Sequence, residues 1–169
     1  MIIILATFNI LLRCGLRSIE IIRADIGDVR QSCGMPILWV HGKGRDIKDE
    51  FVVLTDEALA AIHAYMAVRG KVNVNDPLFV SHSNHNASGR LTTRSIRRMV
   101  KEHLKQTGIN SSRLTCHSLR HTFATLAIAN NAPLLAVQQA MRHADINTTT
   151  IYTHMNDRLT NGAERYVKI

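Results

Sequence analysis

The first dozen residues carry apolar side chains at every third or fourth position, which is the spacing of an amphipathic helix. These positions are Ile4, Leu5, Phe8, Leu11 and Leu12. From residue 25 to residue 54 the pattern changes to short apolar runs that are divided by glycine and proline. The runs predict three short strands at residues 26–29, 37–40 and 51–54, and their short connections make neighbouring strands antiparallel.

Helical spacing returns after the predicted sheet. Thr55, followed by Asp56 and Glu57, is expected to cap a helix that runs to about residue 68. Further helices are expected at residues 92–106, 118–130, 133–141, 147–152 and 157–166. The pattern therefore predicts a mainly α fold with a small three-stranded antiparallel β-sheet, which is an α+β class.

The helix predicted at residues 92–106 has two different faces. Its apolar residues are Ile96, Met99, Val100 and Leu104, and its basic residues on the opposite side are Arg94, Arg97, Arg98, Lys101 and Lys105. Glu102 is the only acid in this segment, whereas a merely solvated face usually mixes both charges. The basic face therefore indicates a surface that binds the phosphates of DNA.

Composition supports a single domain with a polyanionic partner. The 169 residues are 46% hydrophobic, and the net charge is +8. A generically basic surface is the alternative to a nucleic-acid partner. The apolar opening is too short for a membrane span and has no basic leader, so we expect no membrane association. The three cysteines form no disulfide framework, which favours a reducing cytoplasm.

Basic and phenolic residues gather between positions 117 and 152, where carboxylates are scarce. They are His117, Arg120, His143 and Tyr152. Arg120 shares a helix face with His117, and its planar guanidinium can bind both free oxygens of a phosphodiester. Tyr152 is a weak nucleophile unless cations surround it. The set indicates phosphate chemistry with a tyrosine nucleophile; a tyrosine that merely bridges core and surface is the alternative.

Two neighbouring patterns leave alternatives open. His117 and His121 have the spacing of a metal-binding pair, but the segment between them supplies Arg120 where zinc hydrolases need glutamate, so we expect no metal and no cofactor. Lys43 lies at a glycine-flanked turn and is a candidate general acid. A solvated lysine at the hairpin tip is the alternative for Lys43, and Lys48 competes for the acid role.

With these residues the sequence resembles the catalytic domain of the tyrosine recombinases, also called phage integrases, over residues 9–166. Four motifs in the family's order carry the resemblance: GLRSIE at 15–20, GKG at 42–44, HSLRHTFAT at 117–125 and HADINTTTIYTH at 143–154. The resemblance implies that residues 1–169 are one catalytic domain that lacks the family's N-terminal core-binding domain.

The resemblance also implies residue roles. Arg17 and Arg120 would clamp the scissile phosphate, while His117 and His143 would add hydrogen bonds, with His117 a candidate acceptor for the tyrosine proton. Lys43 would protonate the leaving 5′ oxygen. Tyr152 would attack and form a 3′-phosphotyrosyl bond, so that cleavage and rejoining of DNA need neither metal nor ATP.

The sequence departs from the family before the second motif histidine, where Met141-Arg142 replaces the usual Leu-Gly. Arg142 is either one more phosphate contact or an exposed side chain. The family pattern further implies double-stranded DNA as partner and a homotetramer on two duplexes, with this fragment alone a monomer that binds DNA weakly. It implies a bacterial cytoplasmic protein at the nucleoid.

The favoured function is site-specific recombination or integration. The first alternative is DNA relaxation like that of a type IB topoisomerase, against which the match to the integrase motifs argues. A DNA-binding module without catalysis would be expected to lack Tyr152, Arg17 or Arg120, and all three are present. A metal-dependent hydrolase is the remaining alternative.

Overall fold

The computed structural model describes residues 2–41, 44, 46–82 and 89–162. Its elements in chain order are α1 (Ile2–Arg13), α2 (Ser18–Arg23), the 3-10 turn η1 (Ile26–Asp28), β1 (Val29–Ser32), β2 (Met35–Val40), β3 (Glu50–Val53), α3 (Asp56–Arg69), α4 (Thr93–Gln106), α5 (Cys116–Ala129), α6 (Leu134–Met141) and α7 (Asn147–Asn161). The strands form one antiparallel sheet in the order β1-β2-β3. The predicted fold class is confirmed.

The larger hydrophobic core surrounds α1, which packs against α3, α4 and α5. Ile10 and Leu11 of α1 are completely buried there. The sheet adds Leu38 and Val52, which are paired across β2 and β3 and point into the same core. Each such side chain stabilises the fold by roughly 1.5–3 kcal/mol relative to an exposed one.

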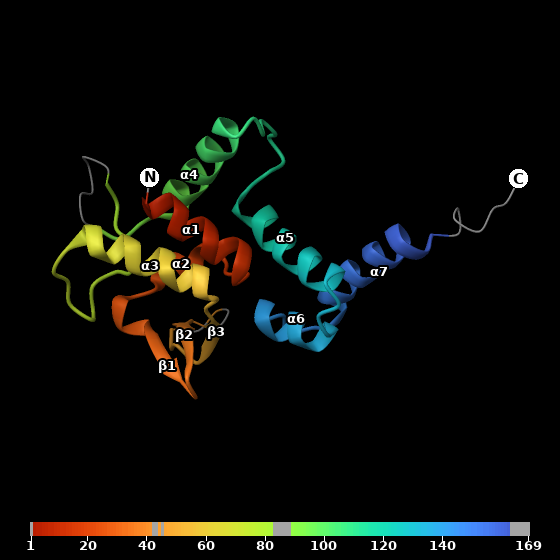
Figure 1. Ribbon diagram of the computed structural model, residues 1–169, viewed down its shortest axis with the longest axis horizontal. Helices are drawn as coiled ribbons and strands as arrows, with labels where there is room; N and C mark the ends of the chain where they lie inside the picture. Colours follow the sequence, from red (N-terminus) through yellow and green to blue (C-terminus); the bar gives the residue numbers. More distant parts are fainter. Residues whose placement is uncertain (1, 42–43, 45, 83–88, 163–169) are drawn as a thin grey trace, which may run out of the picture.

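A second, smaller core joins α5, α6 and α7, which lie together on one side of the molecule (Figure 1). Its buried members are Ala124, Ile128, Val137, Met141 and Tyr152. Helix α5 contributes to both cores, because its first residues pack with α1 and its later residues pack with α6 and α7. The first turns of α5 therefore lie where the two cores meet.

Three threonines cap the N-terminal ends of α3, α4 and α5. The side chain of Thr55 accepts a hydrogen bond from the backbone of Ala58, as predicted. Thr92 and Thr115 cap α4 and α5 in the same way. No helix in the described part of the chain is long and apolar enough to cross a membrane.

Two predicted boundaries are wrong. Residues 26–28 form η1 instead of a strand, because the Asp28 carboxylate accepts a hydrogen bond from the Asp25 backbone (2.7 Å) and closes a turn, so β1 begins only at Val29. The helix predicted at residues 147–152 continues without a break to Asn161, since no glycine or proline interrupts it before Gly162. The predicted separate segment at 157–166 is therefore partly the end of α7.

Candidate active site

A cleft of about 1440 Å³ opens between the sheet and helices α5, α6 and α7. Residues from four separate parts of the sequence line it. Among them are five of the six predicted catalytic residues: Arg17, His117, Arg120, His143 and Tyr152. The fold thus brings to one surface residues that are as much as 135 positions apart, from 17 to 152.

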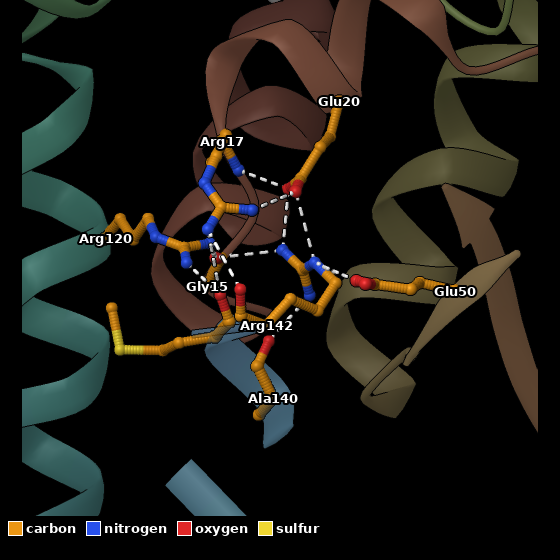
Figure 2. Close-up of polar contacts among 8 residues, drawn as sticks. Gly15, Arg17, Glu20, Glu50, Arg120, Ala140 and Arg142 are labelled. Atoms are coloured by element: carbon orange, nitrogen blue, oxygen red, sulfur yellow. Dashed lines mark hydrogen bonds and ion pairs between the residues drawn. The ribbon is translucent and has the colours of Figure 1, made fainter. Parts of the chain in front are cut away.

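Helix α5 presents Arg120 to the floor of this cleft. The Arg120 side chain is almost completely buried, with 1% of its surface exposed. Its guanidinium donates to the backbone carbonyls of Gly15 and Met141, which orient it (Figure 2). Burial lowers the pKa of Arg120, and the positive charges of Arg17 and Arg142 lower it further. A buried cation of this kind gains most when an anion enters the cleft.

The Gly15 carbonyl reaches Arg120 because the chain turns sharply between α1 and α2. Gly15 has φ of 59°, a conformation that favours glycine. A side chain here would also collide with α5, since a Cβ atom would lie 2.6 Å from Cδ1 of Phe123. The glycine of the first motif therefore allows α1 and α5 to approach closely enough for this hydrogen bond.

Arg17 lies at the start of α2 beside Arg120 (Figure 2). It donates to the Glu20 carboxylate (2.7 Å) and to the backbone carbonyl of Arg142 (3.1 Å). About a quarter of its side chain remains exposed. Arg17 and Arg120 are thus both held by backbone carbonyls at the C-terminal end of α6, with guanidinium groups that can face one bound anion.

Arg142 is buried, so the alternative that it is an exposed side chain is wrong. Only 4% of the side chain is exposed, and it donates to both oxygens of Glu20, at 3.1 and 2.6 Å (Figure 2). Glu50 of β3 lies 3.7 Å away. Burial by itself would raise the pKa of the Glu20 carboxyl, but Arg142 and Arg17 outweigh this and hold the pKa below its usual value.

The surroundings of the two predicted histidines lower the pKa of both in the protein without DNA. Burial, followed by the charges of Arg120 and Arg17, lowers the pKa of His143 to about 4. Its Nδ1 atom lies 3.0 Å from the hydroxyl of the buried Thr149. Burial and nearby His121 also lower the pKa of His117. Both side chains therefore offer hydrogen bonds here, while the arginines supply the positive charge.

Tyr152 projects from the second turn of α7 into the smaller core, and 5% of its surface is exposed. Burial raises the pKa of its phenol, and this effect outweighs the lowering by Arg120. The cations around the cleft therefore do not ionise Tyr152 by themselves. Its hydroxyl is in hydrogen-bond contact with Nδ1 of His121. His121, predicted only as half of a possible metal-binding pair, is thus in contact with the candidate nucleophile.

Of the two lysines predicted as candidate general acids, Lys43 lies outside the described residues. Lys48 forms ion pairs with Asp25 (2.7 Å) and Asp28 (2.5 Å). Burial alone would lower the pKa of Lys48, but these two carboxylates reverse the effect and raise it. Lys48 is therefore held by acids and is poorly suited to give up a proton.

The basic face of α4 is exposed, as the pattern predicted. Ile96 and Val100 are buried, while the five basic side chains on the other side face the solvent: Arg94, Arg97, Arg98, Lys101 and Lys105. Arg97 also lines a small cavity of about 410 Å³ together with Arg17 and Arg120. Arg97 thus links the basic face of α4 to two arginines of the cleft.

Two residues of the site had no separate role predicted from the sequence. Glu20 was predicted only as a member of the first motif, although its position three residues after Arg17 is the spacing of a helical ion pair. His121 has no signal in the sequence that points to Tyr152, because they lie on different helices. Among the described residues, no three His, Cys, Asp or Glu side chains gather in an arrangement that could hold a metal ion.

The geometry agrees with comparisons to known proteins. A family model described as "Phage integrase family" matches residues 2–158. The chain belongs to the phage integrase family. Tyrosine recombinase XerC of Caldanaerobacter subterraneus subsp. tengcongensis is 32% identical over 155 residues, covering 90% of this chain and 41% of that protein. This phage integrase family member therefore spans less than half the length of that relative.

Solved structures of the family have the same fold. The crystal structure of XerA recombinase has a TM-score of 0.73 and 34% identity, covering 95% of this chain and 55% of that one. The XerH site-specific recombinase, in a post-cleavage complex with a palindromic difH substrate, has a TM-score of 0.77 and 26% identity. That match covers 94% of this chain and 44% of XerH.

Proposed function

We propose that this protein is a site-specific DNA recombinase or integrase that cleaves and rejoins strands through a covalent 3′-phosphotyrosyl intermediate. The observation that carries the proposal is the cleft in which Arg17, Arg120, His117 and His143 lie with Tyr152. Its relatives support recombination over topoisomerase-like relaxation, because those named above are recombinases.

In the proposed reaction the scissile phosphate occupies the cleft between Arg17 and Arg120. Their guanidinium groups neutralise the negative charge that builds up on the non-bridging oxygens in the pentacoordinate transition state. The bond from the Tyr152 oxygen to phosphorus forms while the bond to the 5′ oxygen breaks. We assign protonation of that 5′ oxygen to Lys43. The phosphotyrosyl bond conserves the phosphodiester energy, so the reverse attack by a 5′ hydroxyl rejoins DNA without ATP.

His117 and His143 are proposed to donate hydrogen bonds to the phosphate. A phosphodiester carries negative charge, so its binding would raise the pKa of both histidines above the lowered values of the free protein. The histidines would then share in charge stabilisation only after DNA is bound. Arg142, buried against Glu20, is proposed to contribute to phosphate binding through the field of its charge and through its backbone carbonyl, which accepts a hydrogen bond from Arg17.

Double-stranded DNA is the proposed partner, bound along the basic face of α4 and over the cleft. By analogy with its family we propose a homotetramer on two duplexes during recombination and a monomer without DNA. Since the relative named above is bacterial and the substrate is DNA, we propose that it works in the bacterial cytoplasm at the nucleoid.

The test is covalent capture of DNA. The protein is incubated in EDTA with nicked duplexes drawn from the DNA that flanks its own gene, and adducts that resist SDS but not protease are measured. We expect adducts with wild type and none with Tyr152→Phe, because the substitution removes only the nucleophilic oxygen. Tyr65→Phe is the matched control, since Tyr65 lies in the larger core. Adducts that persist in Tyr152→Phe would contradict the proposed nucleophile.

A further inference from the structure

The side chain of His121 links two helices by contacting the Tyr152 hydroxyl, which is the nucleophile of the proposed mechanism. Its Nδ1 atom is in hydrogen-bond contact with the hydroxyl of Tyr152, 31 positions further along the chain. The imidazole belongs to α5 and the phenol to α7. Tyr152 is buried, whereas His121 is exposed, so the imidazole connects the phenol with the solvent-filled cleft.

A buried phenol needs help to become a nucleophile. Burial raises the pKa of Tyr152 despite the nearby charge of Arg120, so the phenol keeps its proton in the free protein. The proton must leave as the bond to phosphorus forms, and a general base has to be within hydrogen-bond reach of it. His121 meets this geometric condition in the structure.

The other two histidines of the cleft are placed differently. Nδ1 of His143 lies 3.0 Å from the Thr149 hydroxyl, so that nitrogen already has a partner. The His117 ring packs edge-on against the His121 ring, with centroids 4.5 Å apart. His117 is thus a neighbour of the imidazole that contacts Tyr152. The role suggested for His117, handling the tyrosine proton, fits His121 better.

We propose that His121 accepts the Tyr152 proton during strand cleavage and returns it during rejoining. This inference rests on the proposed recombinase function. As the Tyr152 oxygen bonds to phosphorus, its proton moves to Nδ1 of His121. The bond from phosphorus to the 5′ oxygen breaks, and that oxygen takes a proton from the general acid. The step requires the His121 tautomer that carries hydrogen on Nε2, which leaves a lone pair on Nδ1.

The test compares leaving groups in single-turnover cleavage. One nicked duplex carries the natural 5′ oxygen at the scissile bond, and the other carries sulfur there, which leaves without a proton. We expect His121→Ala to slow cleavage of both duplexes by about 100-fold, which is typical for loss of a general base. Added imidazole should restore part of the rate. DNA affinity should be unchanged, because the side chain acts on the nucleophile.

Two further variants keep the result interpretable. His154→Ala removes an exposed histidine of α7 and should leave the rate unchanged. His121→Gln replaces the imidazole with an uncharged amide of similar reach, and it should be slow while its folding and DNA binding match wild type. A slow His121→Gln without a folding defect supports proton transfer.

Several outcomes would overturn the inference. A normal cleavage rate for His121→Ala would do so. A rate defect of His121→Ala that disappears with the sulfur duplex would also do so, because it would show that His121 acts on the leaving 5′ oxygen. Imidazole rescue of His117→Ala but not of His121→Ala would assign the base to His117. Failure of the recombinase proposal is distinguishable, since wild type itself would then form no adduct.

Discussion

Glu20 is the carboxylate that both Arg17 and Arg142 contact. The three arginines of the site lie close together, and Glu20, with 3% of its side chain exposed, forms ion pairs with two of them, Arg17 and Arg142. Removing one partner of a buried ion pair leaves a charge without compensation, which is costly. At the residue scale, the arrangement of the arginines therefore depends on Glu20, which has no role in the proposed reaction itself.

We predict different effects for the two partners of this pair. Glu20→Gln should lower the free energy of unfolding by about 3 kcal/mol, because two arginines lose their acid. Arg142→Gly should cost less, since Arg142 has φ of 51°, which glycine adopts without strain, and Glu20 keeps Arg17. Urea denaturation of both variants measures this. A larger loss for Arg142→Gly would show that the Arg142 side chain is the more important partner.

Helix α4 is a two-sided element whose faces have separate tasks. Ile96 and Val100 attach it to the larger core, while its exposed arginines and lysines lie on the other side. Arg97 extends this face to the cavity beside Arg17. Substitutions on the exposed face should therefore change DNA binding without changing stability.

The prediction for α4 concerns salt dependence. Arg97→Gln, Arg98→Gln and Lys101→Gln combined should weaken DNA binding about equally for all sequences. The slope of log affinity against log salt should become shallower by about 0.9 for each phosphate that the variant no longer neutralises. Fluorescence anisotropy between about 50 and 200 mM salt measures both quantities. Lys71→Gln, in the exposed segment after α3, is the matched control. An unchanged slope would mean that α4 does not bind phosphates.

The whole molecule is two cores joined by α5, and the site exists only when both are in place. Arg120 receives one carbonyl from the turn after α1 and another from the end of α6. Tyr152 reaches His121 only because α7 packs against α5. Conditions that weaken the packing of either core should thus separate the residues of the site from one another.

For the whole molecule we predict that stability falls as the pH drops below neutral. The pKa of His143 is lowered to about 4 from an ordinary 6.5, so the unfolded chain binds a proton that the folded protein does not, and stability falls as pH drops through that interval. Urea denaturation as a function of pH measures this fall.

His143→Asn isolates the acidic limb of this profile. The variant has no titrating group at position 143, so its stability should fall less steeply than that of wild type between pH 6.5 and about 4. The remaining slope should come from His117, whose pKa is also lowered, and at more acidic pH from Glu20 and Asp25. Identical slopes for the variant and wild type would contradict the assigned His143 shift.

The resemblance to a known family identified the residues of the four motifs. Local spacing in the amino-acid sequence was enough to predict the fold class, most helices and the basic face of α4. These features follow from periodicity and from the chemistry of side chains, which need no knowledge of distant contacts. The start of β1 was missed because a turn hydrogen bond outweighs the weak apolar pattern of residues 26–28. The full length of α7 was missed because the helix continues through a segment whose apolar pattern is weak.

The connections among the residues of the cleft come from tertiary packing instead. Arg142 is buried against Glu20, 122 positions away, and the Gly15 carbonyl orients Arg120. The contact of His121 with Tyr152 likewise depends on how α7 packs against α5. Periodicity along a chain places a side chain on a face of its own helix. It does not say which distant side chain that face meets, because packing of the whole molecule sets that distance.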